Sequence, residues 1–219
     1  MRPRRRRSVV SLTFDDGTSD QLPVATWLAD RGVPATFYVN SGRVGAPGFL
    51  GWDDLATLAA LGHEIGGHTV DHPDLTTLRP DEAARQVETD RSTLRERGHP
   101  VETFAYPYGA RTRELEDVVA AAGYTAARRA WGLSPETPSE TLPPERRYAI
   151  RTLPSVERTA TAGELVAAVP RGGWLPVVFH LIGDGPSTYE VRRSVFEEFV
   201  QHLLEERTRF ATVAGALGA

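Results

Sequence analysis

Short runs of β-branched and aromatic residues alternate with helix-length amphipathic segments along almost the whole 219-residue chain. This alternation favours repeated β-strand and α-helix units around parallel strands, and it argues against a β-sandwich. Glycines at positions 32, 62, 98 and 123 follow helical segments, where glycine commonly ends a helix. Six or seven such units fit along the sequence. We therefore predict an α/β fold built as a (β/α) barrel.

The pattern assigns each unit to a part of the sequence. The expected strands are residues 9–14, 35–39, 64–66, 103–105, 124–127 and 174–179. The expected helices are residues 21–31, 52–61, 80–97, 112–122 and 189–206, and residues 210–214 form a closing element. Residues 132–144 carry four prolines and no apolar period, so we expect a surface excursion that rejoins the core near Tyr148.

Composition limits the domain organisation and the partners. With 40% hydrophobic residues the chain can bury one substantial core, so we expect a single domain over residues 8–219 after a basic tail at 1–7. A net charge of −4 gives no basic surface for a phosphate backbone, and we expect no nucleic-acid partner. Because the chain has no cysteine, a metal ion must be bound by histidine or carboxylate side chains.

The basic tail contains five arginines and resembles the charged start of a signal peptide, but no apolar region follows it. A solvated tail is the simpler interpretation. No apolar run reaches transmembrane length elsewhere in the sequence. We expect a cytoplasmic protein without a transmembrane segment, with secretion as the alternative.

Polar side chains follow the expected strands at the points where the strands end. Asp15 and Asp16 follow the first strand, and His180 follows the last. His68 and His72 follow the third strand, and Tyr108 follows the fourth. In a barrel of βα units, active sites are built at this end of the strands. We therefore expect these side chains to meet at one face.

The spacing of the histidines indicates a metal site. His68 and His72 are four residues apart, so on a helical turn their imidazoles point the same way and can share a cation. One aspartate of the pair Asp15 and Asp16 would complete a His-His-Asp set with open coordination positions. Neighbouring side chains on an extended backbone point apart, so the other aspartate would act as a base.

Three further groups have weaker signals. The turn at Tyr108, within Pro-Tyr-Gly, can aim a backbone N–H at an oxyanion, and His180 can act as a general acid. His63 and Glu64 begin like a His-Glu-x-x-His metalloprotease motif, but position 67 is glycine, and we interpret both residues as structural.

The motifs Thr-Phe-Asp-Asp-Gly at 13–17, His-Thr-Val-Asp-His-Pro at 68–73, Phe-Ala-Tyr-Pro-Tyr-Gly at 104–109 and Phe-His at 179–180 together resemble those of NodB-type polysaccharide deacetylases, carbohydrate esterase family four. The resemblance spans residues 8–217. It implies a distorted (β/α)7-type barrel with a single catalytic domain. The implied activity is hydrolysis of N-acetyl groups, usually on N-acetylglucosamine, with one divalent ion, zinc with cobalt or nickel as alternatives.

The resemblance also implies a role for each motif residue. Asp15 is the catalytic base, His180 is the general acid, and the backbone N–H of Tyr108 belongs to the oxyanion hole. The implied metal ligands are Asp16, His68 and His72.

The chain departs from the family pattern in two places. Many members carry an arginine that orients the base at the position of Ala105, and the residues that support the catalytic histidine are not recognisable at 128–132. The candidates to replace that arginine are Arg128, Arg129 and Arg151.

Three functions stay open from the sequence. The first is deacetylation of an N-acetylated sugar or glycan, the second is a small-molecule amidase or deformylase with the same site, and the third is a carbohydrate-binding protein without turnover. The aromatic residues Trp52, Tyr106 and Trp131 could stack on a sugar ring, although packing within the fold is the simpler interpretation.

Overall fold

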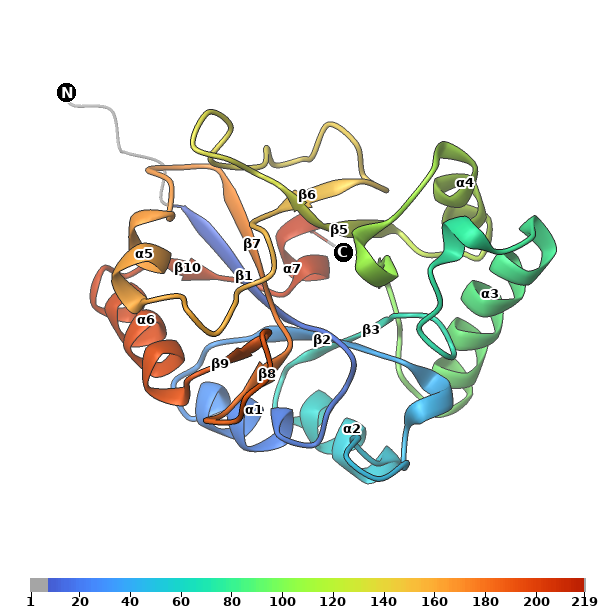
Figure 1. The fold of residues 1–219 in the computed structure, drawn as a ribbon, viewed down its shortest axis with the longest axis horizontal. Coiled ribbons are helices and arrows are strands. Elements are labelled where there is room, and N and C mark those ends of the chain that lie inside the picture. The colour runs from blue at the N-terminus through green and yellow to red at the C-terminus, as the bar shows by residue number, and fades with distance from the viewer. Residues whose placement is uncertain (1–7, 219) are drawn as a thin grey trace.

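The computed structural model describes residues 8–218, so the expected basic tail at 1–7 lies outside the described residues. Seven parallel strands form one strongly curved sheet in the order β7, β1, β2, β3, β4, β5, β6 (Figure 1). Their bounds are Val9–Phe14 (β1), Ala35–Val39 (β2), Glu64–Gly67 (β3), Thr103–Ala105 (β4), Ala126–Gly132 (β5), Ile150–Thr152 (β6) and Trp174–Phe179 (β7).

The two ends of this sheet approach each other. The backbone N–H groups of Leu153 and Val156, just after β6, donate to the carbonyl oxygens of Pro176 and Val178 on β7. The sheet therefore curls into a distorted (β/α)7-type barrel, as the sequence predicts. The short strand β10 (Arg209–Phe210) pairs with the start of β1, and β8 (Leu181–Ile182) pairs with β9 (Glu190–Val191).

Most helices lie around the outside of the curved sheet, whereas the last helix, Val213–Leu217, lies inside this ring in the same view (Figure 1). Their bounds are Gln21–Ala29 (α1), Trp52–Ala60 (α2), Pro80–Glu96 (α3), Arg113–Ala121 (α4), Ala162–Ala167 (α5), Arg193–Glu205 (α6) and Val213–Leu217 (α7). Individual residues determine where several of these helices begin. Pro80 opens α3, and the Thr112 side chain accepts a hydrogen bond from the Leu115 N–H at the start of α4.

An aromatic cluster packs β1 against its neighbours. The Phe14 ring stacks on Phe37 of β2 at 4.8 Å and on Phe179 of β7 at 5.6 Å between ring centroids. Phe196 of α6 meets Phe14 and Phe179 edge-on. All four side chains are almost fully buried, and burial of each is worth about 1.5–3 kcal/mol. The cluster fixes the strand ends at which the first and last motifs lie.

The structure corrects the expected elements in three places. The expected strand at 124–127 begins at Ala126 and continues to Gly132, so it includes two arginines. The expected helix at 189–206 begins only at Arg193, because Glu190 and Val191 pair with β8. Strand β6 and helix α5 were not predicted. The excursion at 132–144 is present, and Glu140 pairs with Trp174 where the chain returns to the barrel.

Among residues 8–218, no helix is both long and apolar enough to cross a membrane.

Candidate active site

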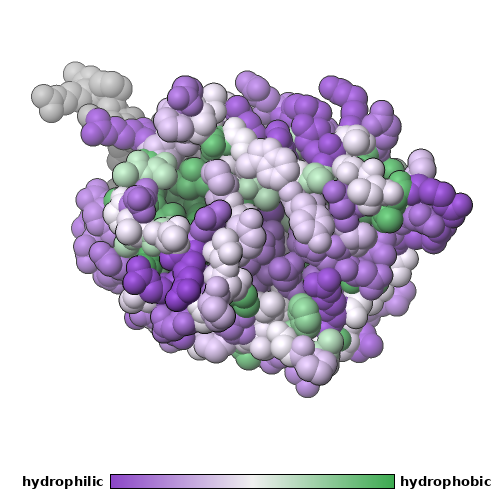
Figure 2. Space-filling model, in the orientation of Figure 1, coloured by the Kyte–Doolittle hydropathy of each residue, from purple (hydrophilic) through white to green (hydrophobic). Residues whose placement is uncertain are grey.

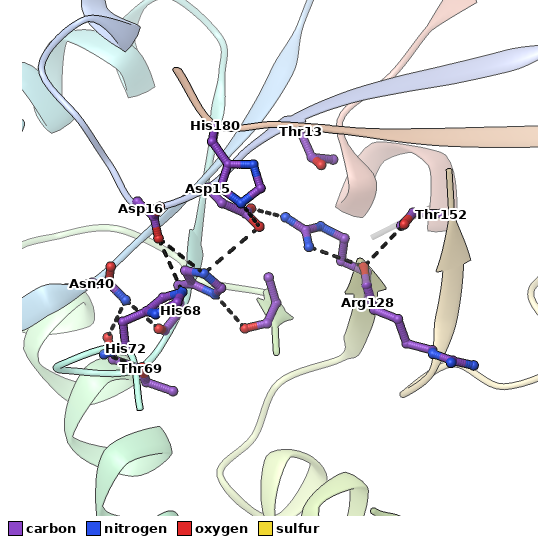
Figure 3. Close-up of polar contacts among 12 residues, drawn as sticks. Thr13, Asp15, Asp16, Asn40, His68, Thr69, His72, Arg128, Thr152 and His180 are labelled. Carbon is purple, nitrogen blue, oxygen red and sulfur yellow. Dashed lines mark hydrogen bonds and ion pairs between the residues drawn. The ribbon is translucent and has the colours of Figure 1, made fainter. Parts of the chain in front are cut away.

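The side chains expected to bind a metal meet at the carboxyl ends of β1 and β3 (Figure 3). One ligand atom from each of Asp16, His68 and His72 lies within 4.8 Å of the other two. The Asp16 Oδ1 atom is 3.3 Å from His72 Nε2 and 3.7 Å from His68 Nε2. Asp16 Oδ1 and His68 Nε2 are buried and have no hydrogen-bond partner in the part of the chain that the structure describes. Two imidazoles and one carboxylate around a shared point fit a divalent cation.

Hydrogen bonds fix the tautomer and orientation of His68. Its Nδ1 atom lies 2.7 Å from the Ala105 carbonyl oxygen, to which it donates, so the Nε2 lone pair faces the cluster. Burial lowers the pKa of His68 to about 4, which keeps the ring neutral at pH 7. Asn40 donates to the His68 carbonyl oxygen at 2.6 Å.

A buried carboxylate supports the same residue from behind. Asp90 of α3 accepts hydrogen bonds from the backbone N–H groups of Ser41 and His68, both at 3.0 Å. Burial raises the pKa of Asp90 to about 7, although these donors oppose the shift. A side chain at Gly67 would overlap both Asp90 and the Tyr124 hydroxyl, so this close approach needs glycine.

The loop that carries His72 is not the helical turn expected from the sequence. Residues 68–74 form no helix, and Thr69 and His72 have positive φ angles of 71° and 62°. Asp16 and Tyr108 also have positive φ angles, of 72° and 56°. Such conformations cost on the order of 1–3 kcal/mol each and concentrate at functional sites. Irregular backbone, rather than helical spacing, directs the two imidazoles to one point.

Gln86 of α3 holds this loop in place. Its Oε1 atom accepts from the backbone N–H groups of Val70 and Asp71 at 3.0 and 3.1 Å, and its Nε2 donates to the Asp71 carboxylate at 2.9 Å. The Thr69 hydroxyl accepts from the His72 N–H at 3.0 Å. These bonds compensate for the strained backbone.

The Asp15 and Asp16 side chains lie on two sides of the His68 Nε2 atom (Figure 3), although Asp16, with its φ angle of 72°, is not on the extended backbone that the sequence predicts. The Asp15 side chain is buried, and its Oδ2 atom lies 4.0 Å from His68 Nε2 and 3.9 Å from His180 Nε2. Burial by itself raises the pKa of the Asp15 carboxyl, but the positive charge of Arg128, with smaller contributions from the two histidines, holds it below its usual value. The carboxylate is therefore ionised at neutral pH.

Arg128 of β5 contacts Asp15 in this chain, which has Ala105 at the position where the family pattern puts an arginine. Its Nη2 donates to Asp15 Oδ1 from β5, and its guanidinium also lies 4.5 Å from the centroid of the Tyr38 ring. Arg128 pairs in register with Ala105 on the neighbouring strand, and both are fully buried. Of the three arginines considered from the sequence, the structure brings only Arg128 to Asp15, whereas Arg151 pairs with Glu140. The sequence pattern predicts that this strand ends at Ala127, so it does not place Arg128 on a strand that faces Asp15.

His180 follows β7 and stands across Asp15 from the metal-binding cluster (Figure 3). Its ring lies 5.2 Å from the ring of Tyr189. Its Nδ1 atom is buried without a hydrogen-bond partner among the described residues, so no carboxylate supports it there.

These groups line one cleft of about 470 Å³. The large side chains at its edges are exposed, Tyr108 by 60%, Trp131 by 40% and Tyr189 by 44%. In residues 8–218, only Leu61 is a comparably exposed large hydrophobic residue outside the cleft. Exposed aromatic residues therefore gather at this site.

The other aromatic candidates for sugar stacking lie elsewhere. Tyr106 is buried and its hydroxyl donates to the Tyr148 carbonyl oxygen, while Trp52 packs under the Arg97 guanidinium.

His63 and Glu64 have the structural roles expected of them. His63 accepts from the Ala35 N–H, and Glu64 lies at the opposite end of β3 from His68.

Comparison with known proteins gives a consistent family. Residues 2–127 match the model of the polysaccharide deacetylase family. A chitooligosaccharide deacetylase from Bradyrhizobium sp. (strain ANU 289) is 35% identical over 134 residues, which are 58% of this chain and 57% of that protein. The peptidoglycan-N-acetylglucosamine deacetylase PgdA of Listeria monocytogenes is 31% identical over 114 residues, which are 50% of this chain and 23% of that protein. The match thus spans less than two thirds of the length of either relative.

A solved structure extends the likeness to the whole fold. The Xyl-CE4 domain of a multidomain xylanase from the hindgut metagenome of Trinervitermes trinervoides superposes with a TM-score of 0.70 at 18% identity. The superposition covers 97% of this chain and 90% of that domain. The family match includes β1 to β4 and the loops bearing Asp15, Asp16, His68 and His72. The chain belongs to the polysaccharide deacetylase family.

Proposed function

We propose that this protein is a metal-dependent hydrolase that removes N-acetyl groups from N-acetylated glycans of the N-acetylglucosamine type. The observation that carries the proposal is the arrangement of Asp16, His68 and His72 beside an ionised Asp15, with His180 on the other side. The relatives are named as deacetylases of chitooligosaccharides and of peptidoglycan N-acetylglucosamine, which supports the same substrate class.

The residues present fit one divalent ion, zinc with cobalt or nickel as alternatives. Asp16, His68 and His72 would hold it, because their ligand atoms converge. Two of these atoms, Asp16 Oδ1 and His68 Nε2, have no hydrogen-bond partner among the described residues. When bound there, the ion would polarise the acetamide carbonyl and lower the pKa of water.

Asp15 and His180 supply the two proton transfers of amide hydrolysis. Asp15 Oδ2 accepts a proton from the water that adds to the carbonyl carbon, because the Arg128 charge keeps this carboxylate ionised. As the C–N bond breaks, His180 Nε2 donates a proton to the departing amine nitrogen, and acetate is the second product. The Tyr108 N–H, on a backbone with φ of 56°, would donate to the oxyanion.

The surroundings of the cleft favour a glycan over a small amide. Trp131, Tyr108 and Tyr189 can stack on sugar rings, and each is largely exposed in the cleft. The centre of the face in Figure 2 is mostly hydrophilic to neutral, with only small hydrophobic areas. A polar sugar chain suits this surface better than an apolar acyl compound.

The substrate class is tested by acetate release. We expect turnover of chitin oligomers and little turnover of a monomeric acetamide such as N-acetylglucosamine. Turnover confined to small N-acyl amines would instead identify an amidase. Stoichiometric binding of chitin oligomers without acetate release would identify a carbohydrate-binding protein.

Zinc binding is expected to depend on Gln86, although Gln86 is not a ligand. After chelator treatment, the protein should bind one equivalent of zinc in a calorimetric titration. Gln86→Ala should weaken zinc binding by roughly 10- to 100-fold, because the loop that carries His72 loses its anchor. Gln201→Ala, on the exposed side of α6, is the matched control. Equal zinc affinity in both variants would contradict the role of Gln86.

A further inference from the structure

A second pocket, of about 210 Å³, lies between β5, the start of α4 and the segment that leads to β6. Its walls are rich in arginine and it contains none of the groups assigned to hydrolysis. The lining residues are Arg111, Arg129, Glu140, Glu145, Arg146, Ala149 and Arg151. We call it the arginine pocket.

The charges of this pocket do not balance. Arg111 and Arg146 both pair with one carboxylate, that of Glu116 on α4. Arg151 pairs with Glu140 at 2.9 Å. Arg129 makes no ion pair or side-chain hydrogen bond with any of the described residues. Even with the exposed Glu145 counted, four arginines meet three carboxylates, so positive charge is left over.

Among the described residues, Arg129 is the arginine of this pocket that has no ion-pair partner. Its Nε atom is buried and has no hydrogen-bond acceptor within residues 8–218, and the same is true of the Arg111 Nε atom. Burial, together with repulsion from Arg111, Arg146 and Arg151, lowers the pKa of Arg129. A guanidinium presents a planar set of donors that matches a carboxylate, and an unpaired buried donor is costly. A carboxylate in the pocket would satisfy these donors and offset the repulsion.

One side chain connects the arginine pocket to the cleft. The Arg129 guanidinium lies over the Trp131 ring, 5.2 Å from its centroid. Trp131 also lines the cleft that holds Asp15 and His180. A sugar chain that stacks on Trp131 therefore brings its next residue towards Arg129.

We propose that the arginine pocket binds a carboxylate carried by the sugar next to the residue that is deacetylated. This inference rests on the proposed deacetylation at the neighbouring site, and it deepens it. The preferred substrate is then an acidic glycan, in which N-acetylglucosamine alternates with carboxylate-bearing sugars, and neutral chitin oligomers are turned over with a lower kcat/KM.

The test compares two tetrasaccharides that differ in the carboxylate. One is chitotetraose, and in the other alternate sugars carry a lactyl ether carboxylate, as in N-acetylmuramic acid. The wild-type protein should show a higher kcat/KM for the acidic tetrasaccharide. In Arg129→Gln the ratio of the two kcat/KM values should fall by about tenfold or more, because a charge-assisted pair is lost. Arg85→Gln, which removes an exposed arginine from α3, should leave the ratio unchanged.

Binding measurements separate this inference from the proposed activity. Calorimetry with the same two tetrasaccharides should show tighter binding of the acidic one to the wild type and loss of that preference in Arg129→Gln. This result supports the pocket even if neither sugar releases acetate, an outcome that would overturn only the proposed deacetylation. Arg129→Lys keeps the charge but not the fork of donors, and it should retain part of the preference.

Three results would overturn the inference. The first is a wild-type protein that binds both tetrasaccharides equally, and the second is an Arg129→Gln variant that keeps the preference. The third is Arg129-dependent binding of inorganic phosphate without any preference for the acidic tetrasaccharide, which would make the pocket a site for free anions.

Discussion

Asp15→Asn is expected to lower kcat for acetate release by about 10³-fold, with little change in zinc affinity. The amide cannot accept a proton from water, and general base catalysis contributes roughly 10²- to 10⁴-fold. Zinc binding should persist, because Asp15 is outside the Asp16, His68 and His72 cluster and its carboxylate is already paired with Arg128. Kinetics on chitin oligomers and zinc analysis of the same preparation measure both effects.

Asp117→Asn provides the control for this prediction, since Asp117 is an exposed carboxylate on α4. It should keep both its kcat and its zinc. An Asp15→Asn variant that retained more than a tenth of the wild-type kcat would remove Asp15 from the role of base. Loss of zinc together with activity would make Asp15 a ligand instead.

Arg128→Met is expected to reduce both activity and stability. Removal of one partner from a buried ion pair costs about 3–5 kcal/mol of unfolding free energy. The kcat should fall by about 10²-fold, because the unpaired Asp15 carboxylate is no longer held in position. Urea unfolding and steady-state kinetics measure the two losses.

The pH dependence distinguishes this role from a purely structural one. In the wild type the Asp15 pKa is lowered, so its contribution to stability is present above the ordinary aspartate pKa and is lost as the pH falls through the lowered value. Without Arg128, burial dominates and the pKa rises. The acidic limb of kcat/KM should therefore move to higher pH, and the variant should lose more stability at pH 8 than at pH 4.

Arg91→Met is the matched control, because Arg91 of α3 donates to two backbone carbonyl oxygens, those of Val101 and Ala122, remote from the cleft. It should lower stability without moving the acidic limb. Arg128→Lys should restore part of the activity, since it keeps a charge near Asp15. An unchanged pH profile in Arg128→Met would show that Arg128 only fills space.

The pairing of Arg128 in particular with Asp15 could not be predicted from the sequence. Arg128 and Arg129 interrupt an apolar run, so a strand that stops at Ala127 was the natural prediction. The strand continues because Asp15, 113 residues away in sequence, compensates the buried charge. A pairing of this kind depends on which strands face each other across the barrel, and no local pattern records it.

In the loop at residues 68–74, the sequence predicts where the side chains meet but not the backbone conformation that brings them together. The spacing of His68 and His72 predicted that their imidazoles point to one place on a helical turn. The structure brings both imidazoles to Asp16, but residues 68–74 form no helix. Positive φ angles at Thr69 and His72, held by Gln86 and Asp90, produce the convergence. Backbone strain of this kind is set by the surrounding packing and not by residue type.

The sequence by itself determined the parallel αβ architecture, the strand ends at which polar side chains collect, and the residue types able to bind a cation. Hydrophobic periodicity and helix-ending glycines are local signals, so they can be recognised from one chain. The tertiary structure alone decided that Arg128 reaches Asp15 and that Tyr106 is core while Tyr189 faces the cleft. It also decided that Arg129 lies over Trp131 and forms no ion pair with another described residue. Burial and charge pairing across distant strands are properties of the closed barrel, because they exist only once the chain has folded.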